Sequence, residues 1–262
     1  MFLTKHNGGL LSCESIAFLS QTTPKVKINL IMTFSMSARL CYQRLSTNMK
    51  TTLPITGVIF DMDGTLTIPV LKFQELRERL GISDDVDILD YANSAPDYDK
   101  PRIHKIIEDF EDEGNERLQL KPSIHDLFYF LKREQLKTAL LTRNNKKCVD
   151  SFIKRFIHRD NKAIFSEEKH LFSKIVTRDF LPTKPHPAPV HHICAAWKAP
   201  EETVLVVGDD WHDIECGNRA GSVTVLMTKP SNTNIKNKAD FCIDDLSELV
   251  TLLQTNFTVK KD

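Results

Sequence analysis

The 262-residue sequence has no excess of either charge, because 35 basic residues balance 35 acidic ones. This balance argues against a partner such as nucleic acid, which is usually bound through bulk positive charge. No apolar run approaches the roughly 20 residues of a transmembrane helix, so no membrane partner is expected. Internal repeats and low-complexity tracts are also missing. With 41% apolar residues, the chain can form a packed core.

The cysteines form no CxxC pair. The six are scattered, at Cys13, Cys41, Cys148, Cys194, Cys216 and Cys242. This spacing predicts reduced thiols in an intracellular protein, and it argues against a disulfide framework or a zinc site.

Residues 1–50 have a composition of their own. They are rich in Ser and Thr and carry six basic residues and one acidic residue, Glu14, for a net charge of +5. Such a segment predicts a mitochondrial or plastid transit peptide. The alternative is a disordered leader of a cytoplasmic protein, since Met32, Met36 and Met49 could each be the true start.

From Ile55 onward, strand-like and helix-like patterns alternate. The predicted strands are 56–60, 137–142, 173–180, 202–208 and 222–227, and the predicted helices are 123–135, 148–157, 213–221 and 244–257. This alternation predicts an α/β fold, with a Rossmann-like parallel sheet that has helices on both faces. The core domain would comprise residues 55–67 and 121–257.

Residues 68–120 break the alternation and show no convincing strand. Two helical patterns, 69–82 and 100–120, carry apolar stripes formed by Leu76, Leu80, Ile103, Ile106, Ile107 and Phe110. We therefore expect a small helical cap. The acidic run at 108–116 is expected to be a solvated helix face.

Polar residues follow several of the predicted strands. They are Asp61, Asp63, Gly64 and Thr65 after the first strand, Thr142, Arg143 and Asn144 after the second, Lys184 in a proline-rich loop, and Asp209, Asp210 and Asp213 after the strand at 202–208. Ligands of open parallel sheets bind beyond the carboxyl ends of the strands. We expect these side chains to converge on one cleft.

The ordered motifs DMDGT, LLT, KP and GDDWHD resemble those of the haloacid dehalogenase-like (HAD) superfamily of aspartyl-nucleophile phosphohydrolases. The resemblance covers about residues 55–255. The helical insert stands where the phosphoglycolate phosphatase-like branch has its cap. Within that branch, the sequence is similar to plant-type HAD-like hydrolases with an organelle-type leader.

The resemblance implies an enzyme that hydrolyses a small phosphorylated metabolite through an aspartyl-phosphate. Asp61 would be the nucleophile, and Asp63 would serve first as general acid and then as general base. Thr142 and Lys184 would bind the phosphoryl group. The next two residues, Arg143 and Asn144, either contact the substrate or begin the following helix.

The resemblance also implies a Mg²⁺ ion held by Asp61, the backbone carbonyl of Asp63, and Asp209, because Mg²⁺ prefers hard oxygen ligands. Asp213 would lie in the inner or outer shell and steady Lys184.

The other residues near these motifs are given supporting roles. Gly64 would allow a sharp turn beside the phosphate, and the Thr65 hydroxyl would brace that turn. We expect Asp210 to shape its loop, and Trp211 and His212 to pack against it.

Two other functions stay open at this stage. A sugar-phosphate mutase of the same branch would need a basic residue in the cap for a second phosphate, for which Lys72, Arg77, Arg79 and Arg102 are candidates. A non-catalytic regulatory protein could keep the HAD fold without its activity. A monomer or a small homo-oligomer is expected.

Overall fold

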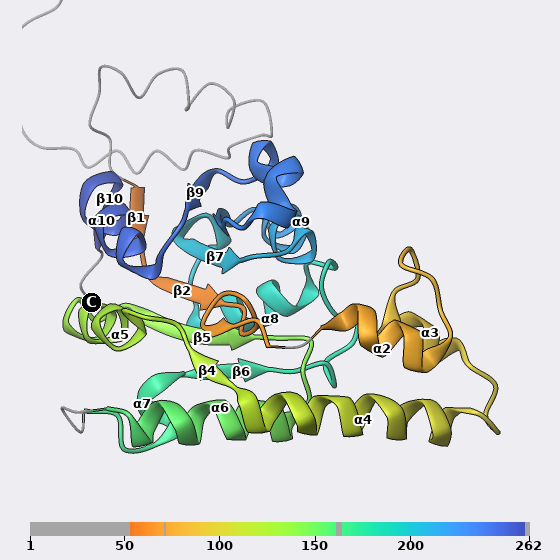
Figure 1. Cartoon of the computed structure of the whole chain (residues 1–262). Helices are drawn as coiled ribbons and strands as arrows, with labels where there is room; N and C mark the ends of the chain where they lie inside the picture. The colour runs from red at the N-terminus through yellow and green to blue at the C-terminus, as the bar shows by residue number, and fades with distance from the viewer. Residues whose placement is uncertain (1–52, 71, 161–163, 260–262) are drawn as a thin grey trace, which may run out of the picture. The chain divides into compact units, whose positions relative to one another are not determined.

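The structure is a computed structural model that describes residues 53–70, 72–160 and 164–259 (Figure 1). These residues belong to one compact unit that spans Lys50–Asp262. The predicted transit peptide at 1–50 lies outside the described residues. Within the described part, no helix has both the length and the hydrophobicity needed to cross a membrane.

A six-stranded parallel sheet forms the centre of this unit. Its strands are β2 (Gly57–Phe60), β5 (Lys137–Leu141), β6 (Lys174–Val176), β7 (Val204–Gly208), β8 (Val223–Met227) and β9 (Phe241–Ile243), in the order β6-β5-β2-β7-β8-β9. The first five were predicted, and β9 was not. Strand β6 is shorter than expected because the chain turns after it, where the Phe180 N–H donates to the Thr177 carbonyl at 3.1 Å.

The sheet is buried on both faces, as the apolar run of β2 shows. Val58 and Phe60 contribute to one apolar cluster, and Ile59 between them contributes to another. Because successive strand residues point to opposite faces, a continuous apolar run is what a doubly covered strand requires.

Helices cover both faces, which confirms the predicted fold class. The first cluster includes side chains of α5 (Ile124–Arg133), α6 (Lys146–His158) and α10 (Leu246–Asn256), and the second includes those of α8 (Ala188–Trp197) and α9 (Trp211–Ala220). Phe128 of α5 lies with its ring centre 5.5 Å from that of Phe60. The smaller elements are β1 (Leu53–Ile55), which pairs in parallel with β10 (Phe257–Val259), α7 (Glu168–Leu171), and the 3₁₀ helices η1 (Glu201–Thr203) and η2 (Pro230–Lys238).

Helix α9 begins at Trp211, two residues before the predicted start. The reason is an N-terminal capping box, in which the Asp210 carboxylate accepts the His212 N–H at 3.0 Å and the Asp213 carboxylate accepts the Asp210 N–H at 3.1 Å. Helix α10 is also capped by an aspartate, because Asp245 accepts the Ser247 N–H at 2.8 Å.

The helical segment between β2 and α5 contains α2 (Phe73–Leu80), α3 (Ile88–Ser94) and α4 (Lys100–Arg117). These helices, visible beside the sheet in Figure 1, share an apolar cluster of their own that includes Leu76 and Ile107. The expectation of no strand is wrong at the ends of the segment. There, β3 (Thr67–Ile68) pairs antiparallel with β4 (Gln119–Leu120) and holds the two connections together.

Candidate active site

The site lies where the sheet changes its direction of growth. After β2 the chain adds β5 and β6 on one side, and it then crosses over to add β7, β8 and β9 on the other. Such a point is where an open α/β sheet binds its ligand, because the two flanking loops part there. Asp61 follows β2 directly, and Asp209 follows β7. A cavity of about 490 Å³ lies at this edge and is lined by residues of both the core and the helical segment.

Lys184 lies at the bottom of the site and joins two carboxylates. Its Nζ is 2.7 Å from Asp61 Oδ1, 2.5 Å from Asp213 Oδ1 and 2.9 Å from the Leu141 carbonyl oxygen. The side chain is only 3% exposed, so it must be paired to be charged there. Although burial opposes it, the two carboxylates raise the pKa of Lys184 above its ordinary value. The expected support of Lys184 by Asp213 is confirmed.

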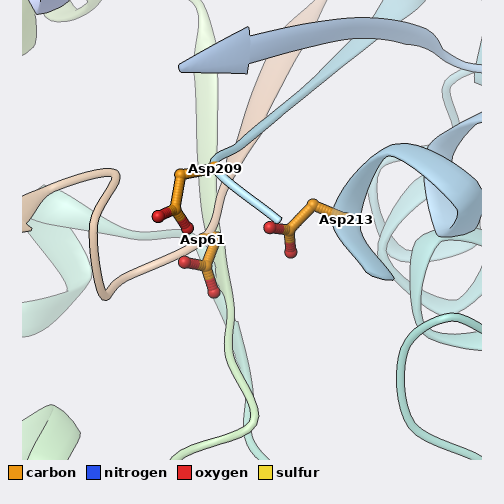
Figure 2. Close-up of side chains that lie close together, drawn as sticks. All are labelled: Asp61, Asp209 and Asp213. Carbon is orange, nitrogen blue, oxygen red and sulfur yellow. The ribbon is translucent and has the colours of Figure 1, made fainter. Parts of the chain in front are cut away.

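Asp61, Asp209 and Asp213 form a cluster of carboxylates (Figure 2), with one oxygen of each within 4.8 Å of the others. Burial raises the pKa of Asp61 well above its ordinary value, and the Lys184 ammonium opposes this shift. Burial, with a further contribution from Asp213, raises the pKa of Asp209 to about 6. Carboxylates held together at this cost in charge repulsion can accommodate a divalent cation with hard oxygen ligands.

The Asp63 side chain lies outside this carboxylate cluster and is oriented by two neighbours. The Thr67 hydroxyl donates to Asp63 Oδ1 at 3.0 Å, and Asn144 Nδ2 donates to Asp63 Oδ2 at 2.6 Å. Asn144 therefore serves the site. The cap of helix α6 is its neighbour, Asn145, which accepts the Cys148 N–H at 2.9 Å.

The loop after Asp63 is braced differently from the prediction. Thr65 Oγ1 is buried and has no hydrogen-bond partner among the described residues, so the bracing role assigned to its hydroxyl is wrong. Thr67 takes that role, because its hydroxyl contacts the Met62 carbonyl oxygen at 3.2 Å as well as Asp63. Gly64 is required not only by the turn but also by the close approach of Asp209. Its φ is +80°, and a Cβ there would lie 2.0 Å from Asp209 Oδ2.

Thr142 and Arg143 follow β5 but face different groups. Thr142 lines the cavity, and its hydroxyl accepts the Asn144 N–H at 3.1 Å. Its contact with a phosphoryl group stays a prediction. Arg143 reaches the helical segment and forms an ion pair with Asp87, in which Arg143 Nη2 alone donates to both carboxylate oxygens, at 2.7 and 2.8 Å.

His212 connects this ion pair to the core. Its Nε2 lies 3.2 Å from Arg143 Nη1, and its Nδ1 contacts Asp210 Oδ1. Its Nε2 also lies 3.7 Å from Asp87 Oδ2, so His212 contacts both members of the ion pair. Although burial opposes it, the hydrogen bonds from His212 lower the pKa of Asp210 to about 2. Asp210 thus shapes its loop as expected, whereas His212 does more than pack against it.

The cavity residues that were not predicted include Lys229 and Glu111. Lys229 Nζ lies 2.5 Å from Asp209 Oδ2. Lys229 comes just after β8, so the rule that polar residues beyond strand ends meet at one edge could have identified it.

Glu111 is the second, and it contradicts the expectation of a wholly solvated acidic run. It is 8% exposed and pairs with Arg178 Nη1 at 2.5 Å. Burial raises the pKa of Glu111 although Arg178 opposes the shift. Its spacing of four residues from the buried Ile107 places it on the inner face of α4, a signal present in the sequence.

Comparison with known proteins identifies the family of the chain. A family model described as haloacid dehalogenase-like hydrolase matches residues 67–227. A haloacid dehalogenase-like hydrolase domain-containing protein of Arabidopsis thaliana is 34% identical over 86% of this chain and 94% of its own. The chain belongs to the haloacid dehalogenase-like hydrolase family.

This HAD-like hydrolase is also similar to proteins of the phosphoglycolate phosphatase-like branch. A phosphoglycolate phosphatase of Pasteurella multocida is 30% identical over 52% of this chain and 58% of its own. The crystal structure of a hydrolase from Pseudomonas syringae superposes with a TM-score of 0.61 and 19% identity, and it covers 78% of this chain and 100% of its own. At that identity, the superposition bears on the fold alone. The resemblance drawn from the four motifs is confirmed.

Proposed function

We propose that this HAD-like hydrolase is a Mg²⁺-dependent phosphatase that cleaves small phosphate monoesters through an aspartyl-phosphate on Asp61. The observation that carries the proposal is the hydrogen bonding of the two Asp61 carboxylate oxygens. Lys184 holds Oδ1, while Oδ2 has no hydrogen-bond partner among the described residues and belongs to a side chain that lines the cavity. A carboxylate oxygen that is positioned but unpaired can attack phosphorus.

The two carboxylates then have different roles, Asp61 as nucleophile and Asp63 as general acid and then general base. Asp61 attacks phosphorus, the bond from phosphorus to the ester oxygen breaks, and protonated Asp63 gives its proton to the leaving alcohol. Water next attacks the phosphoryl group on Asp61 and passes a proton to the Asp63 carboxylate, so that inorganic phosphate leaves and both residues are restored. The bonds from Thr67 and Asn144 hold Asp63 in place for both steps.

The carboxylate cluster suits the Mg²⁺ ion. Asp61 and Asp209 would hold it, and Asp213 and the Asp63 backbone carbonyl are the further oxygen donors available. When bound, the ion neutralises charge on the phosphoryl oxygens. Lys184 adds a second positive charge at the Asp61 side of the site, and Thr142 can donate a hydrogen bond to the phosphoryl group.

The substrate we propose is a small phosphorylated metabolite. The name phosphoglycolate phosphatase, carried by the relative from Pasteurella multocida, supports a compact phosphate ester. The cavity of about 490 Å³ falls within the usual range of small-molecule sites, roughly 300–1,000 Å³.

Hydrolysis of p-nitrophenyl phosphate tests this function. The purified chain is expected to release p-nitrophenol with Mg²⁺, to stop with EDTA and to recover when Mg²⁺ is restored. Asp61→Asn should lower the rate by at least about 10³-fold, because the amide is not a nucleophile. Asp97→Asn is the matched control, since the Asp97 side chain is 96% exposed. Wild-type turnover by Asp61→Asn, or full activity in EDTA, would contradict the proposal.

A further inference from the structure

Almost every cation that lines the cavity already has a carboxylate partner. The contacts are Arg143 with Asp87, Arg178 with Glu111, Lys184 with Asp61 and Asp213, and Lys229 with Asp209. Arg77 is the exception, because it forms no ion pair with any described residue although it lines the same cavity. Its charge therefore has no counter-ion within the protein part that the structure describes.

The donors of Arg77 are also largely unused. The side chain comes from α2 and is half-buried. Its Nη2 donates to the Val86 carbonyl at 3.4 Å, which is a long bond, and its Nε is buried without a hydrogen-bond partner. A guanidinium carries five N–H donors in a fixed plane. Most of them are available to a ligand.

Arg77 differs in this respect from the other basic residues of the helical segment. Arg79, on the same helix, pairs with Glu75 and Glu113, and Arg102 pairs with Asp99. Of these three arginines and Lys72, Arg77 is the one that lines the cavity. The helical segment thus presents a single unpaired cation to the site.

A half-buried cation without a partner is costly, and an anion that binds in the cavity removes that cost. The reacting phosphoryl group already meets the core residues Lys184 and Thr142 under the proposed function. Arg77 comes from a different part of the chain and is available to a different group of the ligand. Its neighbours Phe73, Leu76 and Ile107 line the cavity with apolar surface, which suits a short carbon skeleton.

We propose that the substrate is a phosphate monoester with a second anionic group, and that Arg77 binds this group. This inference rests on the proposed phosphatase function. A carboxylate and a second phosphoryl group share the chemistry that a guanidinium recognises, since each accepts two parallel N–H bonds. Arg77 is then a substrate-binding residue that selects among phosphate esters.

Matched substrates separate the second anion from the reacting phosphate. Glycerol 3-phosphate and 3-phosphoglycerate differ by a hydroxymethyl group in place of a carboxylate. Propanediol monophosphate and propanediol bisphosphate differ by a second phosphoryl group. We expect kcat/KM to be at least about 10-fold higher for the anionic member of one or both pairs. The pair with the larger ratio identifies the anion.

Variants then assign the preference to Arg77. Arg77→Met should abolish the preference for the substrate with a second anion, because KM for that substrate rises about 10- to 100-fold. KM for the member of the pair without the second anion should change less than about twofold. Arg77→Lys should restore part of the preference, because it returns the charge without the planar pair of donors. Arg79→Met is the matched control on the same helix and should keep the wild-type ratio. Thermal unfolding of all three variants checks that they fold.

The outcomes are distinguishable from failure of the proposed function. Hydrolysis of p-nitrophenyl phosphate with no preference in either pair would overturn the role of Arg77 and leave the phosphatase intact. Equal losses for charged and neutral substrates in folded Arg77→Met would overturn it as well. No hydrolysis of any phosphate ester, p-nitrophenyl phosphate included, would refute the phosphatase and this inference with it.

Discussion

At the scale of one residue, the buried Asp209 carboxylate lowers the stability of the metal-free protein. Burial raises the pKa of its carboxyl to about 6, while Lys229 pairs with it at 2.5 Å. An acid whose pKa is higher in the folded state binds protons more tightly there. In metal-free protein, the contribution of Asp209 to stability therefore falls as the pH rises from about 4 to about 6, and the loss is complete above that.

The Asp209→Asn variant isolates this effect. In EDTA, it should become more stable than the wild type as the pH rises from 4 to 6, by up to about 2–3 kcal/mol, with a constant difference above pH 6. Urea unfolding between pH 4 and 8 measures the difference. Asp210→Asn should show the opposite sign. The lowered pKa of Asp210, about 2, stabilises the fold above pH 4, so the Asp210→Asn variant is less stable than the wild type there. A less stable Asp209→Asn at pH 7 would refute the account.

The sequence predicted residues whose position follows from a strand end. Asp61, Thr142 and Asp209 were placed correctly at the cavity because parallel strands end at one edge. The choice between Thr65 and Thr67 could not be predicted, because both follow the same strand and only the turn at Gly64 decides which hydroxyl reaches Asp63.

At the scale of elements, Asp87 links α3 to the core. Its carboxylate caps α3 by accepting the Leu89 and Asp90 N–H groups at 3.0 and 3.1 Å, and it also pairs with Arg143. Asp87→Ser keeps a residue able to cap and removes the ion pair. We expect KM for p-nitrophenyl phosphate to rise about 3- to 10-fold with a smaller change in kcat, since the helical segment is held less firmly over the cavity.

Steady-state kinetics with a matched control decide this point. Asp99→Ser removes the Asp99–Arg102 pair, which lies within the helical segment, and should leave KM unchanged. Added salt should raise KM of the wild type more than that of Asp87→Ser, because only the wild type retains the pair. Equal KM values for Asp87→Ser and the wild type would show that the ion pair does not position the segment.

Helices were predicted where the sequence shows a long stripe of apolar residues at helical spacing. Helix α4 was predicted from a long apolar stripe, whereas α3 has seven residues and a single fully buried one, Ala92. Helix α8 was overlooked although its pattern was present. Its buried residues have the helical spacing of i, i+3, i+4 and i+7, directly after a proline-rich loop; they are Val190, Ile193, Cys194 and Trp197.

At the scale of the whole described unit, the residues proposed for the chemistry and the residue proposed for substrate selection come from different parts of the chain. Asp61, Lys184 and Asp209 stand on loops of the sheet, whereas Arg77 and Glu111 come from the helical segment, which has an apolar cluster of its own. Motifs in the sequence marked the first group because their spacing follows the strands. The second group was predictable only in part. Arg77 was one of four candidate basic residues, and the choice among them depends on how α2 packs over the cavity.

The central claim is that Asp61 becomes covalently phosphorylated. The direct measurement is mass spectrometry of peptides after rapid acid quenching of Asp63→Asn with p-nitrophenyl phosphate and Mg²⁺. This leaving group needs little protonation, so the first step proceeds while the second lacks its base. The account predicts a stoichiometric phosphoryl group on the peptide that contains residue 61, and none in Asp61→Asn. Turnover without a phosphorylated peptide, or a phosphoryl group on another residue, would contradict it.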